Sequence, residues 1–87
     1  IELGEIEVIA GGLAEVDRCC CLYNQEKKKI ILFCQLAKDC ELTGIQIRSM
    51  LKEVLTSYMV PNKVVVLDAL PINANGKIDR QALKTML

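Results

Sequence analysis

The sequence predicts a small α+β domain, in which a three-stranded sheet made of a hairpin and one further strand packs with about three helices. Its 87 residues are 52% hydrophobic and carry 11 basic and 11 acidic side chains, which is typical of one globular domain without net charge. Three segments show apolar residues at helical spacing, and three shorter runs have a strand-like composition. A chain of this length supports one thin core, so residues 1–87 are assigned to a single domain.

Residues 2–10 are expected to form the first helix. Leu3, Ile6 and Ala10 recur at intervals of three and four residues, which is the spacing of one helix face. Acidic residues fill the first turns, where carboxylates interact favourably with the helix dipole. The pair Gly11-Gly12 predicts that the helix ends at a residue with positive φ.

Two strands joined by a hairpin are expected next, at residues 14–23 and 30–36. Both runs are rich in small or β-branched apolar side chains, and strands that follow one another in sequence pair most simply with each other. The polar residues 24–29 predict the turn between them. The lysine triplet at 27–29 is interpreted as part of a solvated loop, with a docking patch for an acidic partner as the alternative.

The longest helix is expected to begin after Thr43 and to continue until Pro61 prevents it. Thr43 and Gln46 form the T-x-x-Q pattern of a capping box, in which each side chain accepts a hydrogen bond from the backbone N–H of the other residue. The apolar positions follow the i, i+3, i+4, i+7 rule. They are Ile47, Met50, Leu51, Val54, Leu55 and Tyr58.

Residues 63–68 predict a third strand that pairs beside the hairpin. The apolar run at 64–67 does not alternate with polar residues, which indicates a strand covered on both faces or central in the sheet. A segment rich in turn-forming residues follows, with Asn-Gly at its tip. Asp79 is expected to cap a last helix that runs to Leu87. The apolar face of that helix is formed by Ile78, Ala82, Leu83 and Met86.

The composition disfavours several classes of function. The chain has no His, which is the usual general base and the commonest neutral metal ligand, so most self-contained hydrolase mechanisms are disfavoured. With two Tyr, one Phe, no Trp and no net charge, it lacks the stacking residues and the positive field of a nucleic-acid binder. We therefore expect no nucleic-acid partner.

The expected environment is the cytoplasm. No apolar run reaches the roughly 18 residues of a membrane span, and the first residues have neither the basic flank nor the apolar stretch of a signal peptide. A soluble protein without a membrane partner is expected. The chain also starts without Met and enters a helical pattern at once, which suggests that it is part of a longer protein.

Five cysteines occur, at positions 19, 20, 21, 34 and 40. Their odd number and the lack of a C-x-x-C pair argue against a disulfide framework and against a zinc site. Successive strand residues alternate between the two faces, so Cys20 is expected to point away from Cys19 and Cys21. The cysteines are interpreted as reduced, buried, small apolar side chains that bind no metal. Thiol redox chemistry or metal storage through residues 19–21 is the alternative.

One polar segment, between the last strand and the last helix, is a candidate site. Its members are Asn75, Gly76, Lys77, Ile78, Asp79 and Arg80. Gly76 permits a tight turn, and Ile78 can anchor the loop to the core. Asp79 can cap the helix while offsetting the charge of Arg80, which leaves the Lys77 ammonium free to reach a partner. An ordinary Asn-Gly turn with a solvated lysine is the simpler interpretation of these residues alone.

Three segments resemble core motifs of the adenylate-forming enzymes. Residues 67–83, LDALPINANGKIDRQAL, resemble the final core motif in the form found in nonribosomal peptide synthetase adenylation domains. Residues 1–7, IELGEIE, resemble the end of the motif that follows the hinge, without the Arg-Gly segment that usually precedes it. Residues 57–61, SYMVP, resemble a third recurring phrase. The chain is therefore similar, over its whole length, to the C-terminal subdomain of these enzymes.

The resemblance implies a mobile lid. In this family a large N-terminal domain binds ATP and the acid substrate, and the small C-terminal subdomain swivels over it. Lys77 would then be the catalytic lysine, which contacts the reacting carboxylate and the α-phosphate while the acyl adenylate forms. Asn75, Gly76, Asp79 and Arg80 would support its loop.

The resemblance also implies a second half-reaction. After rotation of the lid, the face near Gly4 and Glu5 would line the path of a phosphopantetheine thiol. The implied partners are an N-terminal adenylation domain in cis, which together with the hinge is missing from residues 1–87, and a carrier protein with a phosphopantetheine arm. ATP and Mg²⁺ are implied for the full-length parent, and none is expected on this fragment. We expect the isolated chain to fold and to be inactive.

Two alternatives stay open from the sequence. The chain could be the lid of an acyl-CoA synthetase or of a D-alanine-activating ligase, although the Asn-Gly-Lys-Ile-Asp-Arg form at 75–80 favours amino-acid activation. It could also be an independent α+β module, whose lysine loop and lysine-rich hairpin bind an acidic protein. The specificity pockets of the family lie in the N-terminal domain, so the activated acid cannot be deduced from these residues.

Overall fold

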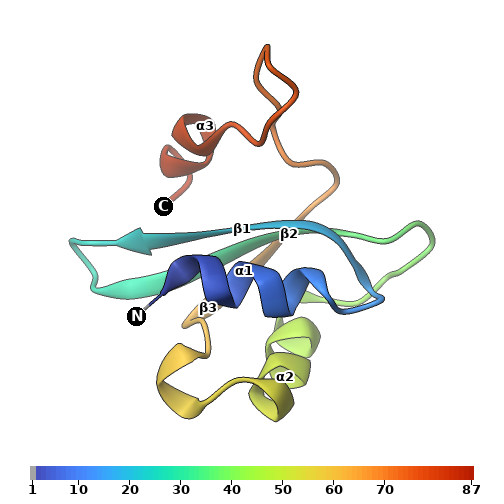
Figure 1. Cartoon of the computed structure of the whole chain (residues 1–87), viewed down its shortest axis with the longest axis vertical. Coiled ribbons are helices and arrows are strands. Elements are labelled where there is room, and N and C mark those ends of the chain that lie inside the picture. The colour runs from blue at the N-terminus through green and yellow to red at the C-terminus, as the bar shows by residue number, and fades with distance from the viewer. Residues whose placement is uncertain (1) are drawn as a thin grey trace.

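The computed structural model describes residues 2–87; Ile1, the first residue of the N-terminal motif, lies outside the described residues. The three strands form one sheet in the order β1-β2-β3, in which β1 and β2 are an antiparallel hairpin and β3 pairs with β2 in parallel. The predicted α+β class, with a three-stranded sheet and three helices, is confirmed (Figure 1). The elements in chain order are α1 (Leu3–Gly11), β1 (Val16–Asn24), β2 (Lys29–Leu36), α2 (Gly44–Val54), the 3-10 turn η1 (Ser57–Met59), β3 (Lys63–Leu67) and α3 (Arg80–Lys84).

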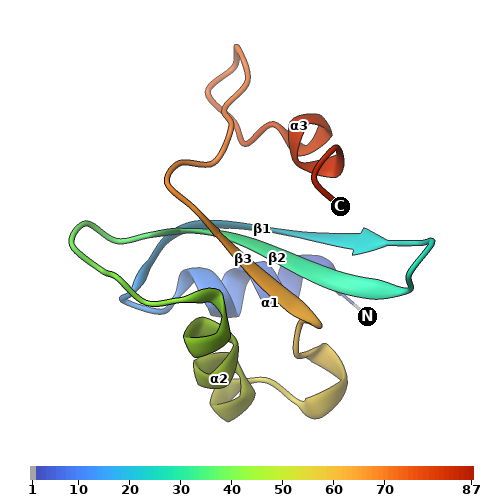
Figure 2. The same ribbon diagram turned by 180° about the vertical axis from the view of Figure 1, so that it is seen from behind.

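The sheet separates two layers, and the apolar cluster of one is larger than that of the other. Helices α1 and α2 lie on one side of it, and α3 with the loop that precedes it lies on the other side (Figures 1 and 2). On the first side, Ile6 of α1 and Ile47 and Leu51 of α2 are fully buried against the strands. On the other side, Leu83 of α3 is fully buried in a smaller cluster with Phe33 of β2. Among residues 2–87, no helix has the length and hydropathy that crossing a bilayer requires.

The cysteines follow the predicted alternation. Cys20 belongs to the cluster on the α3 side, whereas Cys19 and Cys21 belong to the cluster beneath α1. All five thiols are free. The predicted burial is right for Cys20, Cys21 and Cys34, but Cys19 and Cys40 are only partly buried, because Cys19 lies near the start of edge strand β1 and Cys40 in the loop before α2.

Burial makes four of these thiols weaker acids than an ordinary cysteine. It raises the pKa of Cys21 and of Cys34 to about 12 and the pKa of Cys19 to about 11, from an ordinary value of 9.0. It also raises the pKa of Cys20. The thiolate is the nucleophile and the metal ligand, so these four side chains behave as apolar groups at neutral pH.

Helix α2 begins as predicted but ends earlier. The capping box is confirmed: Thr43 Oγ1 accepts a hydrogen bond from Gln46 N at 3.2 Å, and Gln46 Oε1 accepts one from Thr43 N at 2.8 Å. The prediction that the helix continues to Pro61 is wrong, because Leu55 adopts extended backbone at φ −107° and ψ 147°. Tyr58, placed by helical spacing on the buried face, is consequently 68% exposed.

The break in the helix keeps the apolar residues beyond it buried. Leu55 and Met59 both pack into the cluster beneath α1 and α2, although they lie outside the regular helix. Val54, the last residue of α2, is exposed instead. Tertiary packing therefore overrides the helical spacing at the end of this segment.

Three further predictions need correction. Helix α1 ends without a positive φ, because Gly12 has φ −80° and its N–H donates to the carbonyls of the preceding turn. Strand β3 pairs beside the hairpin as predicted, but the alternative that it is central is wrong, because it lies at an edge of the sheet and β2 is central. The other alternative, cover on both faces, agrees with the structure, since Val64 packs in the cluster under α2 and Val65 and Leu67 pack against the α3-side cluster. Helix α3 stops at Lys84, which leaves Met86 53% exposed rather than on an apolar face.

Candidate functional site

Lys77 lies near the tip of a closed loop between β3 and α3. Ile72 and Ile78 pair as an isolated antiparallel bridge at the base of this loop. Asn73 N donates a hydrogen bond to Lys77 O at 2.8 Å, while Asn73 Oδ1 accepts hydrogen bonds from Lys77 N at 3.1 Å and from Asn75 N at 2.9 Å. The loop is thus closed around Asn73. The sequence analysis assigned no role to this residue, although an Asn three residues before a Gly is a turn signal.

The predicted tight turn is confirmed at Gly76. Its φ of +79° lies in the left-handed region, and its N–H donates to Asn73 O at 3.0 Å. A Cβ at Gly76 would have no atom within 4 Å, so backbone conformation rather than space favours glycine here. Lys77 is exposed and forms no salt bridge with any of residues 2–87, and the loop projects away from the sheet (Figure 1). Its ammonium is therefore accessible to a binding partner.

Two of the predicted supports of the loop are confirmed. Asp79 Oδ1 accepts a hydrogen bond from Ala82 N at 3.1 Å, so Asp79 caps α3. Ile78 is half-buried and packs against the cluster of Phe33 and Leu83. The loop is therefore attached to the α3 layer through a cap and an apolar anchor.

The prediction that Asp79 offsets the charge of Arg80 is wrong. Arg80 pairs with Glu7 of α1, with Nη1 at 3.0 Å from Oε2 and Nη2 at 3.2 Å from Oε1. This hydrogen bonding raises the pKa of Arg80. The Asp79 carboxylate instead faces the backbone N–H groups at the start of α3, whereas the Arg80 side chain extends toward β1. Neighbours in sequence therefore point to different partners.

The carboxylate of Glu7 connects three elements. Besides Arg80 of α3, it accepts a hydrogen bond from the backbone N–H of Cys21 in β1 at 2.6 Å. Arg80 Nη1 also donates to Cys20 Sγ at 3.1 Å. The Glu7 side chain is 20% exposed, so this network lies at the rim of the sheet. No local pattern could predict it, since Glu7 and Arg80 are 73 positions apart.

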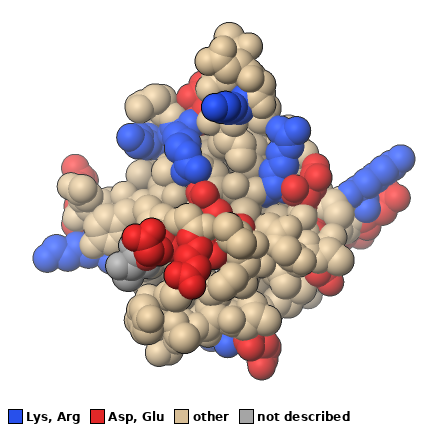
Figure 3. Space-filling view, in the orientation of Figure 1, with Lys and Arg blue, Asp and Glu red and all other residues tan. Residues whose placement is uncertain are grey.

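A hollow of about 630 Å³ lies between the lysine loop and the open edge of β1, and we call it the Lys77 hollow. Figure 3 shows basic side chains gathered on the upper part of this face and acidic side chains below them. The charged residues that line the hollow are Glu7, Asp17, Arg18, Lys77 and Arg80. Because no carboxylate of residues 2–87 pairs with Lys77, its ammonium can turn toward an anion placed in the hollow.

The structure separates the two predicted functional regions. Gly4 and Glu5 lie in the first turn of α1 and are exposed, and a Cβ at Gly4 would have no atom within 4 Å. Helix α1 lies on one side of the sheet, whereas the lysine loop projects from the other side (Figure 2). Of the residues of α1, Glu7 and Gly11 line the Lys77 hollow, whereas Gly4 and Glu5 do not.

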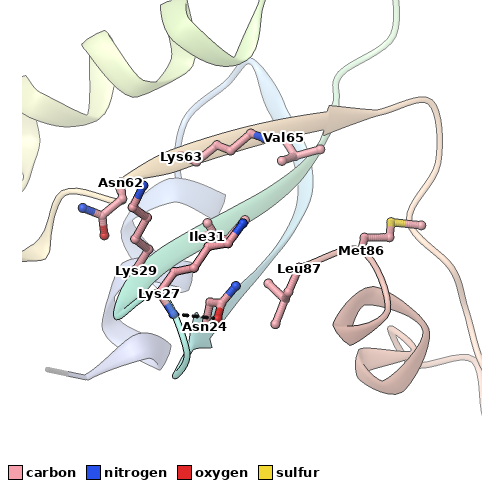
Figure 4. Close-up of a pocket in the computed structure, with 9 residues that line it drawn as sticks. All are labelled: Asn24, Lys27, Lys29, Ile31, Asn62, Lys63, Val65, Met86 and Leu87. Atoms are coloured by element: carbon pink, nitrogen blue, oxygen red, sulfur yellow. Dashed lines mark hydrogen bonds between the residues drawn. The ribbon is translucent and has the colours of Figure 1, made fainter.

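A second hollow, of about 270 Å³, lies between the hairpin turn and the C-terminal residues (Figure 4). Lys27, Lys29 and Lys63 come to it from the hairpin turn and from the starts of β2 and β3. Met86 and Leu87 form an apolar part of its wall. The described residues that line it include three lysines and no acidic side chain, so it presents a local excess of positive charge. We call it the lysine groove.

The described residues offer no ready metal site. Among residues 2–87, no three side chains of His, Cys, Asp or Glu gather closely enough to hold a metal ion. The carboxylate of Glu7 is engaged by Arg80 and by the Cys21 amide.

The fold, with its lysine-bearing loop, matches parts of larger proteins of known structure. Apo MatB from Rhodopseudomonas palustris matches with a TM-score of 0.85 at 20% identity, over 99% of this chain and 18% of that one. This match concerns the fold alone. Unliganded O-succinylbenzoate coenzyme A synthetase from Bacillus subtilis matches with a TM-score of 0.76 at 29% identity, over 98% of this chain and 17% of that one.

The chain belongs to the AMP-binding enzyme C-terminal domain family, whose model matches residues 5–77. One of the linear gramicidin synthase proteins of Brevibacillus parabrevis is 40% identical over 86 residues, which is 95% of this chain and 2% of that protein. Gramicidin S synthase 2 from Brevibacillus brevis is 32% identical over 84 residues, again 95% of this chain and 2% of that protein. The chain thus spans only a small part of the length of these curated relatives.

Proposed function

We propose that this domain is the mobile C-terminal lid of an amino-acid-activating adenylation enzyme and supplies Lys77 for formation of the aminoacyl adenylate from ATP. One observation carries the proposal: in a member of this family, an exposed lysine with no salt-bridge partner among residues 2–87 is presented on a loop whose backbone is closed by Asn73. The partners in this role are an N-terminal adenylation domain in cis and a carrier protein, and the proposed location is the cytoplasm.

Lys77 would act by electrostatic stabilisation. Attack of a carboxylate oxygen on the α-phosphate forms one O–P bond and breaks another, with pyrophosphate as the leaving group, while negative charge is redistributed over the phosphoryl oxygens. An ammonium brought close to those oxygens in a water-depleted cleft stabilises that charge. The hydrogen bonds of Asn73 to both backbone groups of Lys77 limit the motion of the lysine Cα. Lys77 needs to serve neither as nucleophile nor as base.

A rotation of the domain would serve the second half-reaction. The loop between β3 and α3, which carries Lys77, and helix α1, which carries Gly4 and Glu5, lie on opposite sides of the sheet (Figures 1 and 2). Exchanging one for the other at a single cleft therefore requires the whole domain to turn. Exposed Gly4 leaves space on α1 where a narrow thiol-bearing arm could pass. Mg²⁺ would accompany ATP in the full-length enzyme, and the role of Lys77 does not depend on it.

The test is a pair of single-turnover assays on the full-length enzyme that contains this domain. Lys77→Ala should lower adenylate formation, followed by pyrophosphate release, by on the order of 10² to 10³, the scale of losing one preorganised electrostatic contact. Thiol loading from supplied aminoacyl adenylate should keep most of its rate. Gly4→Trp should show the reverse pattern, with a thermal melt to verify the fold. Equal losses in both assays for Lys77→Ala would contradict the assigned role.

Amino-acid activation is preferred to activation of other acids. Several relatives that align along nearly all of this chain at 32–40% identity are gramicidin synthases, whereas the match to a coenzyme A synthetase is at 29% identity. A panel of amino acids, D-alanine and fatty acids in the pyrophosphate-release assay separates the alternatives. Release with fatty acids alone would reassign the domain to an acyl-CoA synthetase.

The lysine groove favours a second candidate function, that of a protein-interaction module for an acidic partner. Lys27, Lys29 and Lys63 all line it, without an acidic side chain among the described lining residues, whereas Lys28 of the same triplet does not line it. Lys27→Glu/Lys29→Glu/Lys63→Glu should abolish binding of a Glu-rich, Leu-containing peptide, with Lys28→Glu/Lys38→Glu/Lys52→Glu as a control of equal charge change. Equal binding by the two triple variants would reject this candidate.

A further inference from the structure

We propose that Glu7 is a positioning residue for adenylation, which holds the Lys77 loop in its working orientation through the two-point ion pair with Arg80. This inference rests on the proposed role of Lys77. It adds a residue of α1, on the far side of the sheet, to the determinants of the first half-reaction.

The hydrogen bonds within the lysine loop do not by themselves orient it relative to the sheet. Its hydrogen bonds from Asn73 to Lys77 close the loop upon itself and do not fix its direction relative to the sheet. Its base is held by the apolar contact of Ile78 and, further back, by the hydrogen bond from Leu70 N to Gln35 Oε1 at 2.9 Å. Apart from that one hydrogen bond, these contacts with the sheet are apolar and not directional, so they restrain rotation of the loop about its base only weakly.

The ion pair with Glu7 provides a second directional restraint, on the side of the loop that follows Lys77. Arg80 is three residues beyond Lys77 and is the first residue of α3. Its guanidinium meets both oxygens of the Glu7 carboxylate, at 3.0 Å and 3.2 Å, and such a fork fixes an orientation as well as a distance. Among residues 2–87, it is the single salt bridge of the structure.

Glu7 is itself held by the rigid part of the domain. Its carboxylate accepts the backbone N–H of Cys21 at 2.6 Å, which saturates a backbone donor on the open edge of β1. The helix that carries it is anchored by Ile6 and Ala10, both fully buried. A continuous connection therefore runs from the sheet through Glu7 and Arg80 to the loop of Lys77.

Two variants separate the ion pair from the other contacts. Glu7→Gln keeps an oxygen that can accept the Cys21 N–H but loses the charge, and Arg80→Lys keeps the charge but loses the two-point geometry. Lys84→Gln is the control, because it removes one positive charge from α3 at an exposed residue that pairs with no carboxylate of residues 2–87. Lys77→Ala serves as the reference for complete loss of the lysine.

The experiment measures both half-reactions in the full-length enzyme. Glu7→Gln and Arg80→Lys should each lower kcat for adenylate formation about tenfold, within the range that misplacement of a reacting group by about 1 Å can cause. The KM for ATP and thiol loading from supplied adenylate should stay within about twofold, because a displaced loop affects only the step that uses Lys77. The double variant should be no slower than the worse single variant.

Each outcome bears on the proposal. Parallel losses in adenylate formation and thiol loading would indicate a merely structural contact and would overturn it. Unchanged kcat in both variants, with a hundredfold loss in Lys77→Ala, would also overturn it while leaving the role of Lys77 intact. If Lys77→Ala itself is without effect, both proposals fail. A loss in Lys84→Gln as large as that in Glu7→Gln would assign the effect to the change of charge rather than to the ion pair and would reject positioning.

Discussion

The two faces of the sheet differ in what they contribute. The face under α1 and α2 buries twelve residues of the described chain, drawn from both helices, the 3-10 turn and all three strands. The face under α3 buries six, and it carries the lysine loop that projects beyond them (Figure 1). Burial of apolar surface is the main source of stability, so most of the stability resides on the face that lies opposite Lys77.

This division suits a domain whose site must reach another surface. A loop that is lightly attached can adjust on contact, whereas the larger cluster keeps the sheet rigid beneath it. The link between the two faces is the pair of Glu7 and Arg80, which passes around the open edge of β1. Matched substitutions on the two faces measure how far the faces are independent.

The largest expected effect concerns the core under α2. Leu51→Ala should cost about 3–4 kcal/mol, because Leu51 is fully buried and the cavity left behind cannot collapse. For a domain of this size such a loss approaches the whole stability.

Leu83→Ala, on the other face, should cost about 2–3 kcal/mol and release mainly α3. Urea unfolding of the 87-residue chain measures the first value, and amide hydrogen exchange in α3 measures the second. Equal global losses would show that the two faces unfold as one.

The next effect concerns two glycines in the helices of the larger layer, Gly4 in α1 and Gly44 in α2. Gly44→Ala should destabilise by about 2–3 kcal/mol, the scale of an overpacked core, because its Cβ would clash with the carbonyl oxygen of Val64 in β3. Gly4→Ala should instead stabilise by about 0.5–1 kcal/mol, since it lies in a helix with open space around it. Thermal melts of both variants are the measurement. A neutral Gly44→Ala would mean that α2 can move away from β3 at little cost.

A smaller effect depends on pH. The folded-state pKa of Cys21 is raised by burial to about 12, from 9.0. Both states hold the proton below pH 9, so the stability is fully present there, and it is lost as pH rises toward 12 because the unfolded chain ionises first. Cys21→Ala should therefore reduce the loss of stability between pH 8 and pH 10 by about 1 kcal/mol. Urea midpoints at both pH values test this, and an unchanged pH dependence would contradict it.

The smallest effect concerns the two helix caps, one on each face. Thr43→Ala removes a capping box with hydrogen bonds of 2.8 Å and 3.2 Å and should cost about 1 kcal/mol of global stability. Asp79→Ala removes the cap of α3; it should cost less than Thr43→Ala and raise hydrogen exchange in residues 80–84. Thr56→Ala is a matched control, because Thr56 precedes η1 without a side-chain cap. A full global loss for Asp79→Ala would show that the α3 face is not a separate layer.

Local chemistry decided most of the elements that the sequence predicted. The hairpin, the capping box at Thr43 and the cap at Asp79 depend on residues close together in the chain, so their patterns are visible in sequence. The accessibility of Lys77 and the left-handed turn at Gly76 belong to the same category. The resemblance to the adenylate-forming enzymes likewise rested on contiguous motifs, and the family match confirms it.

Tertiary structure decided the features in which distant segments compete or meet. Helix α2 ends at Val54 because burying Leu55 and Met59 against the strands outweighs continuation of a helix that would carry Tyr58 on the same face. The edge position of β3 depends on its partner in the sheet, which its apolar run does not encode.

The pairing of Arg80 with Glu7 rather than with adjacent Asp79 shows the physical reason most clearly. A charged side chain pairs with the partner that the folded backbone brings within reach in a suitable geometry, and sequence distance does not measure that reach. The sequence by itself determined that an exposed lysine would lie on a turn before a helix capped by Asp79. Only the packing of α1 and α3 around β1 decided what holds that loop in place.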